Sequence, residues 1–305
     1  MTRRARLDAE LVRRGLARSR EQAVELVAAG RVSVRGQAAT KPATGVAPGD
    51  AVVVRADPAG PAYASRGGHK LAGALASFGA ASPPLVVTGR RALDAGASTG
   101  GFTDVLLRAG ATSVVAVDVG YGQLAWALRS DPRVTVLDRT NVRTLTPEAV
   151  GGPAELVVAD LSFISLLTVL PSLLGCTAPT GDLVLLVKPQ FEVGRDRLGV
   201  GGVVRDPALR AESAMSVAAA AQVRGWGTRG LVASSLPGPA GNRELLLWLA
   251  RGAPPLDEGV AATAAADPPR SRYDAPDRSA HAAPGPSVAG PSVPAPSVPA
   301  SRGVR

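Results

Sequence analysis

The chain has 305 residues, of which 46% are hydrophobic, and it carries a formal net charge of +9. This length accommodates one medium α/β domain and a smaller module. The single cysteine, Cys176, excludes a disulfide framework. Because the chain has only two histidines besides, we expect no metal. The excess of basic residues favours a polyanionic partner.

Neither the N-terminal residues nor the longest uncharged stretch predicts a membrane protein. The first residues, Met-Thr-Arg-Arg, lead into polar sequence with no apolar segment of the kind found in a signal peptide. The uncharged stretch 161–181 is long enough to span a bilayer, but Ser162, Ser165 and Pro171 interrupt it. We interpret it as a strand end, a loop and a core helix, and we expect a cytoplasmic protein.

Residues 1–60 predict a small, basic α+β module followed by a linker. Leu7, Leu11 and Val12 have helical spacing, Gly15 can end that helix, and Gly30 can end a second one. The second helix is expected to begin at 19–22, where Ser-Arg-Glu-Gln fits a capping box. Alternating valines at 32–34 and 52–54 predict short strands, joined through a turn at 48–50.

The run RLDAELVRRGLARSREQAVELVAAGRVSVRGQAATKP closely resembles an S4 RNA-binding domain. Residues 1–60 carry eleven Lys and Arg against six Asp and Glu. The resemblance implies that basic side chains of this module face the phosphates of folded RNA. The candidate RNA-binding residues are Arg3, Arg4, Arg6, Arg13, Arg14, Arg18, Arg20 and Lys41.

Residues 61–251 predict a doubly wound, mostly parallel sheet. Apolar blocks that read as strands alternate with helical stretches. The expected strands are 92–93, 113–117, 133–137, 156–159, 183–187 and 230–234, and the expected helices include 103–109, 123–129 and 207–224. Residues 252–305 are rich in Pro, Ala, Gly and Ser and repeat Pro-Ser-Val three times, so we expect a disordered tail.

A glycine-rich turn follows the first expected strand of this sheet. In DAGASTGGF, the spacing from Asp94 to Gly96 and Gly100 fits neither a dinucleotide fingerprint nor a Walker loop. It resembles the methyltransferase motif that holds S-adenosylmethionine. Acidic and amide side chains that end the next two strands are expected near the ribose and adenine. The candidate cofactor-binding residues are Asp94, Gly96, Ser98, Gly100, Gly101, Phe102, Asp118, Asp138 and Asn141.

Lysine is rare in this chain, with only Lys41, Lys70 and Lys188 among 34 basic residues. A lysine can lose its proton when buried, whereas an arginine cannot. Lys188 ends an apolar strand in LVKPQFE, and Asp160 ends the preceding one in VVADLSF. With Lys70 in SRGGHKL and Glu244 in GNREL, these residues resemble the Lys-Asp-Lys-Glu tetrad of FtsJ-type 2'-O-methyltransferases.

Taken together, the motifs resemble the TlyA family (haemolysin A-like), in which an S4 domain precedes an FtsJ-like domain. The resemblance implies a Rossmann-like methyltransferase fold, S-adenosylmethionine as cofactor, and 2'-O-methylation of cytidine in 16S or 23S rRNA. It also implies that Lys70, Asp160, Lys188 and Glu244 are catalytic. Pro61-Ala62-Tyr63-Ala64 departs from the basic and tryptophan residues of relatives, which questions a role of the linker in cofactor binding.

Three readings of function remain open at this point. The chain is expected to be a monomeric or weakly associating rRNA methyltransferase. A non-catalytic RNA-binding or ribosome-assembly factor is the first alternative, and the intact tetrad argues against it. A haemolysin is the second, and it would require an exported chain able to enter membranes.

Overall fold

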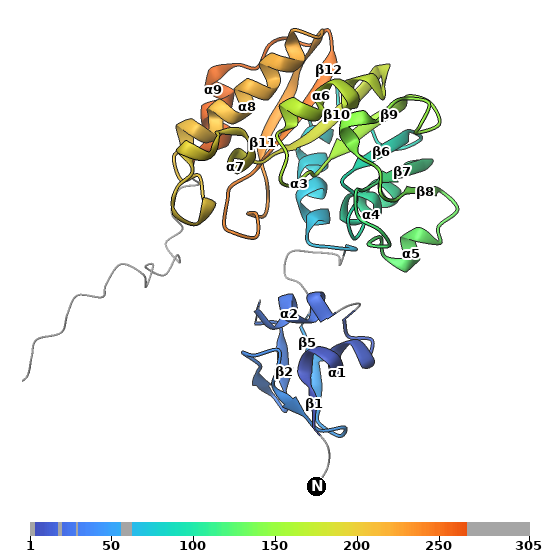
Figure 1. Ribbon diagram of the computed structural model, residues 1–305, viewed down its shortest axis with the longest axis vertical. Coiled ribbons are helices and arrows are strands. Elements are labelled where there is room, and N and C mark those ends of the chain that lie inside the picture. The colour runs from blue at the N-terminus through green and yellow to red at the C-terminus, as the bar shows by residue number, and fades with distance from the viewer. Residues whose placement is uncertain (1–3, 18–19, 29, 56–62, 267–305) are drawn as a thin grey trace, which may run out of the picture. The chain divides into compact units, whose positions relative to one another are not determined.

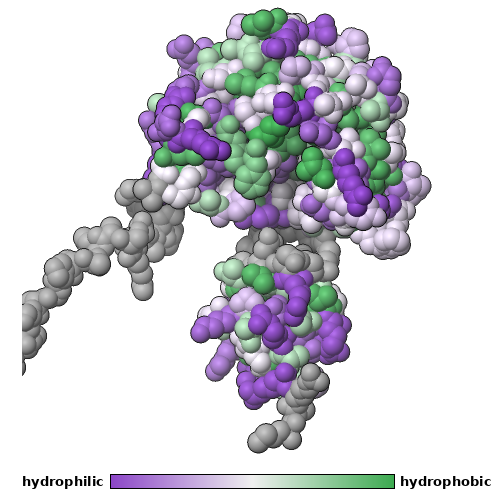
Figure 2. Space-filling view, viewed as in Figure 1, coloured by the Kyte–Doolittle hydropathy of each residue, from purple (hydrophilic) through white to green (hydrophobic). Residues whose placement is uncertain are grey.

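The computed structural model describes residues 4–17, 20–28, 30–55 and 63–266 (Figure 1). The remaining residues include Arg3, Arg18 and Ser19, so the expected capping box lies outside the described part. Figure 2 shows hydrophilic and hydrophobic residues interspersed over the visible face of residues 63–266. No described helix is long and apolar enough to cross a membrane.

The small α+β module is built as the sequence predicts. Its helices are α1 (Leu7–Arg13) and α2 (Arg20–Ala28), and each is followed by a glycine with positive φ, Gly15 and Gly30. Antiparallel strands form the sheet β3-β2-β5, and β1 pairs with β4. The strand bounds are β1 (Ala5–Arg6), β2 (Val32–Val34), β3 (Gln37–Ala38), β4 (Gly45–Val46) and β5 (Val52–Val54).

The larger domain is a seven-stranded sheet with the order β11-β12-β10-β9-β6-β7-β8. Its bounds are β6 (Arg91–Ala95), β7 (Ser113–Val117), β8 (Val134–Leu137), β9 (Ala154–Ala159), β10 (Thr177–Val187), β11 (Trp226–Ala233) and β12 (Leu245–Arg251). The five strands from β8 to β10 are parallel, and β12 and β11 continue the sheet antiparallel. The expected mostly parallel α/β sheet is therefore confirmed.

Helices cover both faces of this sheet (Figure 1). The helices α3 (Gly67–Gly79) and α4 (Gly101–Arg108) share one core with alternate strand residues such as Ala92 and Val184. The other core joins α6 (Leu166–Gly175), α8 (Pro207–Gln222) and α9 (Glu258–Ala265) to strand residues such as Leu93 and Leu183. The alternation follows from the two-residue period of a strand.

Short helical segments complete the domain. They are α5 (Trp126–Arg129), α7 (Pro189–Glu192), η1 (Val142–Thr144), η2 (Arg195–Arg197) and η3 (Val200–Gly202). The predicted helix 123–129 is thus reduced to its last turn, and the stretch 161–181 holds the ten-residue helix α6 and the start of β10. The sequence reading missed α3 and did not list β12.

The expectation of a disordered tail from residue 252 is wrong for its first part. Asp257 accepts a hydrogen bond from the amide of Val260 and caps α9. Leu256, Ala261 and Ala265 are buried in the core that α8 also lines. The domain therefore extends to residue 266, and 267–305 lies outside the described residues. Alanine-rich composition misled the prediction because small side chains suffice where two helices pack closely.

Candidate active site at the carboxyl edge of the sheet

The predicted site residues meet at the point where the strand order reverses. The chain passes from β6 outwards to β7 and β8, then returns to β9 on the other side of β6. The carboxyl ends of β6 and β9 lie at this reversal, which is the position where open α/β sheets bind ligands. The amide of Asp160, just after β9, donates to the carbonyl of Ala95 at the end of β6.

Two glycines of the turn after β6 lie too close to their neighbours for a side chain. Gly96 has φ +89°, and a Cβ built there would lie 2.5 Å from the carbonyl oxygen of Asp160. At Gly101, a Cβ would lie 2.3 Å from the hydroxyl oxygen of Ser65. The amides of Gly101 and Phe102 open α4, where a helix has no intrahelical acceptor for its N–H groups. The start of α4 thus has two backbone donors without an intrahelical acceptor next to the turn.

Two expected cofactor contacts differ in detail from the prediction. The amide of Gly100 donates to the carbonyl of Ala97, at 2.7 Å, so it is already engaged. The side chain of Phe102 is buried in the core below the turn. Only its backbone amide, in the first turn of α4, is left as a candidate contact. Ser98, by contrast, is exposed and has φ +46°.

Asp94 lies beneath the turn with no exposed surface. Its Oδ2 accepts a hydrogen bond from the Thr103 hydroxyl at 2.6 Å, and Oδ1 is a buried atom without a partner. Burial raises the pKa of Asp94 to about 7, and the charges of Asp160 and Asp118 add to this effect. Asp94 is therefore an incompletely satisfied carboxyl group directly under the predicted cofactor site.

The expected ribose and adenine residues end the next two strands. Asp118, after β7, accepts from the amides of Ser98 and Gly120, at 2.8 and 2.7 Å. Asp138, after β8, pairs with Arg129, and this hydrogen bond lowers the pKa of Asp138. The side chain of Asn141 caps η1 and the residue is exposed. Asp118 thus connects the glycine turn to the end of β7.

Lys188 is held by two oxygens of the loop that follows β9. Its Nζ lies 2.7 Å from Asp160 Oδ1 and donates to Ser162 Oγ at 2.8 Å. The pairing follows from register, because β9 and β10 are parallel neighbours and Leu185 lies opposite Ala159. Lys188 is only 8% exposed, so its ammonium group is directed by these contacts and not by solvent.

Lys70 and Glu244 form a second buried ion pair. Lys70 Nζ lies 2.5 Å from Glu244 Oε2, although 174 residues separate them in the chain. Lys70 comes from the first turn of α3, and Glu244 directly precedes β12. Leu245 lies opposite Val187 in the sheet, which brings Glu244 close to the strand end that carries Lys188. All four predicted catalytic residues therefore belong to one edge of the sheet.

Contacts around these pairs reveal residues that the sequence reading missed. Ser162 contacts Lys188, and Asn242, which is 2% exposed, accepts from the amide of Val204 and donates to the carbonyl of Gly202. Both lie within two residues of a predicted catalytic carboxylate. A search for polar residues flanking Asp160 and Glu244 would have listed them, but nothing in the sequence indicates their partners.

In the small module, several candidate RNA-binding residues also have internal partners. Arg6 pairs with buried Asp8 at 2.9 Å, and Arg20 approaches the same carboxylate at 4.0 Å. Arg14 is mostly buried, pairs with Glu10 and donates to the carbonyl of Asp50. Arg14 therefore holds the turn before β5, and its contact with phosphates stays a prediction. The other basic candidates described, Arg4, Arg13 and Lys41, are exposed, and Arg13 also pairs with Glu10 at 2.6 Å.

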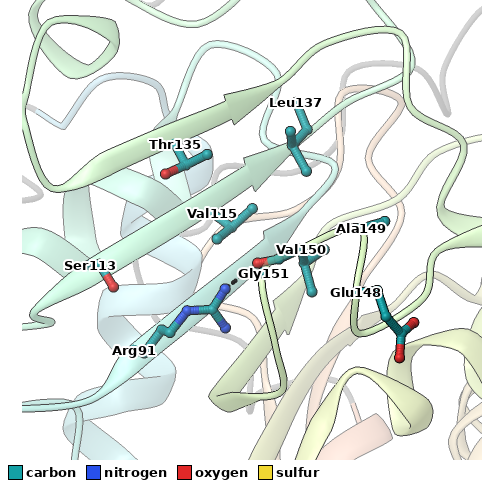
Figure 3. A pocket seen from close by; sticks show the side chains of 9 residues that line it. All are labelled: Arg91, Ser113, Val115, Thr135, Leu137, Glu148, Ala149, Val150 and Gly151. Carbon is teal, nitrogen blue, oxygen red and sulfur yellow. Dashed lines mark hydrogen bonds between the residues drawn. The ribbon is translucent and has the colours of Figure 1, made fainter.

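A hollow of about 450 Å³ lies elsewhere on the domain, over the face of β6, β7 and β8 (Figure 3). It is open because only η1 and the turn around Glu148 connect β8 to β9, where a longer helix would cover the sheet. Arg91 in its wall donates to the carbonyls of Val150 and Gly152. None of the predicted site residues lines this hollow.

Comparisons with known proteins define the class of this chain. Residues 63–251 match the model of the FtsJ-like methyltransferase family, and residues 5–52 match the S4 domain. The chain belongs to the FtsJ-like methyltransferases, in the branch that carries an S4 domain and is represented by TlyA.

Individual relatives are similar over most of their length. The 16S/23S rRNA (cytidine-2'-O)-methyltransferase TlyA of Mycobacterium tuberculosis is 63% identical over 249 residues, which cover 82% of this chain and 91% of the relative. Hemolysin A of Brachyspira hyodysenteriae is 37% identical and covers 67% and 82%, respectively. A solved Streptococcus thermophilus structure with a hemolysin name is 38% identical, with a TM-score of 0.67, and covers 87% and 96%.

Proposed function

We propose that this protein transfers a methyl group from S-adenosylmethionine to a ribose 2'-hydroxyl of ribosomal RNA, at cytidine in 16S or 23S rRNA. The observation that carries the proposal is the buried ammonium group of Lys188, held by Asp160 and Ser162 beside the glycine turn. The TlyA relative from Mycobacterium tuberculosis, which is named for this reaction, supports the choice of nucleotide.

The donor and acceptor set at the turn fits S-adenosylmethionine. Helix-start amides of Gly101 and Phe102 suit a carboxylate, and the Asp118 carboxylate suits a ribose diol. The unpartnered Oδ1 of Asp94 suits a nearby cationic or donor group. When bound, the cofactor supplies a methyl group on a positively charged sulfur.

Lys188 would act on the 2'-hydroxyl, which is a weak acid and must lose its proton as it attacks. A positive ammonium group near that oxygen stabilises the developing negative charge. A neutral amine would instead accept the proton. Asp160 Oδ1 lies 2.7 Å from Lys188 Nζ, and this ion pair holds the ammonium group in place. We assign Lys188 an orienting and charge-stabilising role, in which the proton of the hydroxyl would pass to water and the demethylated cofactor, S-adenosylhomocysteine, would leave.

The Lys70–Glu244 pair would orient the nucleotide beside Lys188. Because the pair is buried and neutral overall, it adds polar groups to the edge of the site without adding net charge. Holding the hydroxyl in line with the methyl group would contribute much of the rate enhancement.

The S4 module would dock the enzyme on folded rRNA through exposed arginines such as Arg4 and Arg6. With ribosomal subunits as substrate, the proposed place of action is the cytoplasm and the proposed acting form is a monomer, with neither metal nor membrane taking part.

Lys188→Arg and Lys188→Ala test the assignment. Arginine keeps the charge but cannot act as a base. We expect Lys188→Ala to lower the single-turnover rate on ribosomal subunits by roughly 10²–10³-fold, the effect of removing one charge-stabilising donor. Lys188→Arg should retain part of the activity. Cofactor and subunit affinities, measured by calorimetry and filter binding, are the controls.

The outcomes separate the candidate functions. Wild-type activity in Lys188→Ala would remove Lys188 from the mechanism. No methyl transfer by the wild-type protein to either subunit, with intact RNA binding, would favour a non-catalytic assembly factor. The hemolysin names of two relatives make lysis of red cells by the purified protein a second assay, and we expect none.

A further inference from the structure

The loop from Asp160 to Leu166 connects β9 to α6 and carries both oxygens that contact Lys188. Its conformation is unfavourable by itself. Phe163, in its middle, has φ +64° and is 92% exposed. Residues other than glycine adopt the left-handed region only where neighbouring contacts hold them there.

The holding contacts come from the segment that follows Lys188. The carboxylate of Glu192 accepts from the Ser165 hydroxyl at 2.6 Å and from the amide of Leu166 at 2.8 Å. The Ser165 hydroxyl oxygen in turn accepts from the amide of Leu167, so α6 begins on this cluster. Phe191 lies beside Phe163, with ring centroids 5.5 Å apart.

The two segments are thus joined at both ends. Lys188 binds the start of the loop, and Glu192, four residues later, binds its end. Burial raises the pKa of Glu192, because withdrawal from water disfavours the charged form of a carboxyl group. The carboxylate fixes the end of the loop, because it accepts hydrogen bonds from one hydroxyl and from one amide at the start of a helix.

We infer that Glu192 is a positioning residue for Lys188. By fixing the start of α6, it keeps Ser162 and Asp160 where both can contact the Lys188 ammonium group. Glu192 contacts the loop and not Lys188, so it acts through the loop. The inference rests on the proposed function, because it assumes that Lys188 serves methyl transfer.

Three substitutions at Glu192 distinguish the length of the side chain from its charge. Gln has the length of Glu and can still accept from Leu166 while its amide nitrogen donates to the Ser165 oxygen. Asp keeps the charge but is one methylene shorter, and Ala removes the contacts. We expect Glu192→Gln to retain kcat within about threefold, and Glu192→Asp and Glu192→Ala to lose at least about tenfold, with the KM for ribosomal subunits nearly unchanged. Glu258→Gln, at an exposed glutamate of α9, is the matched control.

Two further readouts distinguish positioning from general stability. Hydrogen exchange at the Leu166 amide should accelerate in Glu192→Ala, without a matching change in the strands. The kcat losses of Ser162→Ala and Glu192→Ala should be less than multiplicative when combined, because both act through the same ammonium group. If Glu192→Ala folds poorly, the contrast between Gln and Asp is still measurable.

The inference is overturned if Glu192→Ala keeps wild-type kcat, if Asp is active where Gln is not, or if the two losses simply multiply. Failure of the proposed function is detected separately, because the wild-type protein would then transfer no methyl group, and failure of the Lys188 assignment would appear as wild-type methylation by Lys188→Ala. A dead Lys188→Ala with a fully active Glu192→Ala rejects only the role of Glu192.

Discussion

Asp94 is the residue whose environment departs most from that of an ordinary surface carboxylate. It is fully buried, half satisfied by Thr103, and has a pKa of about 7. Because the native protein holds this proton to higher pH than the unfolded chain, it binds more protons between about pH 4 and 7. Stability of the protein without cofactor should therefore fall as pH rises through this window.

Asp94→Asn should remove this dependence, since the amide oxygen can still accept from Thr103 and never ionises. We expect the variant to match the wild type near pH 4 and to be more stable at pH 8, by on the order of 3–4 kcal/mol. Urea unfolding across a pH series measures it, and the exposed Asp196→Asn is the control. A constant difference between variant and wild type at all pH values would contradict the raised pKa.

Gly96 and Gly89 have similar positive φ values, +89° and +82°, but different surroundings. A Cβ at Gly96 meets the Asp160 carbonyl at 2.5 Å, and one at Gly89 meets nothing within 4 Å. Both alanine variants carry the left-handed backbone cost of roughly 1–2 kcal/mol. We expect Gly96→Ala to cost at least about 2 kcal/mol more and to weaken cofactor binding, whereas equal unfolding midpoints would show that the turn can move.

At the scale of elements, the structure explains why the sheet domain does not end with β12. The helix α9 packs on α8 and β11, and it buries Leu256, Ala261 and Ala265 in the main core. Removing it would expose the facing side of α8 as well as these residues.

Two truncations test the contribution of α9. A chain that ends at residue 266 should have the melting temperature of the full-length protein. In a chain that ends at 253, the free energy of unfolding should fall by roughly 2–4 kcal/mol, because the buried apolar surface of three residues and their contacts is lost. Differential scanning calorimetry of both truncations measures it. Identical melting temperatures would mean that α9 adds nothing to the domain.

At the scale of the whole molecule, the proposed division of labour assigns RNA docking to the small basic module and chemistry to the sheet domain. Arg6→Gln with Arg20→Gln should weaken binding to ribosomal subunits and leave cofactor affinity unchanged. The loss should shrink as salt rises, and the slope of log K against log salt should become shallower by about 1–2.

Because Arg6 and Arg20 also contact Asp8, the melting temperature of this double variant has to be measured alongside. Arg197→Gln, which breaks a surface pair with Glu212 in the sheet domain, is the control for loss of a surface arginine outside the module. An unchanged salt slope in the double variant would contradict docking by this face of the module.

The sequence alone determined the local features of this protein. Glycine spacing after β6 placed the turn beside Asp94, helix-ending glycines bounded α1 and α2, and apolar alternation placed most strands of the sheet. The scarcity of lysine singled out Lys70 and Lys188, which the structure finds in buried ion pairs. These features depend on neighbours within a few residues, so the order of residues carries them.

Only the tertiary structure decided which groups meet. Lys70 and Glu244 are 174 positions apart, so their pairing is a consequence of α3 packing near the start of β12. The register across β9 and β10 places Lys188 beside Asp160. The helix α9 was missed because its alanines become apolar core only against α8. Burial, and with it the raised pKa of Asp94, depends on neighbours from several strands, which no local pattern specifies.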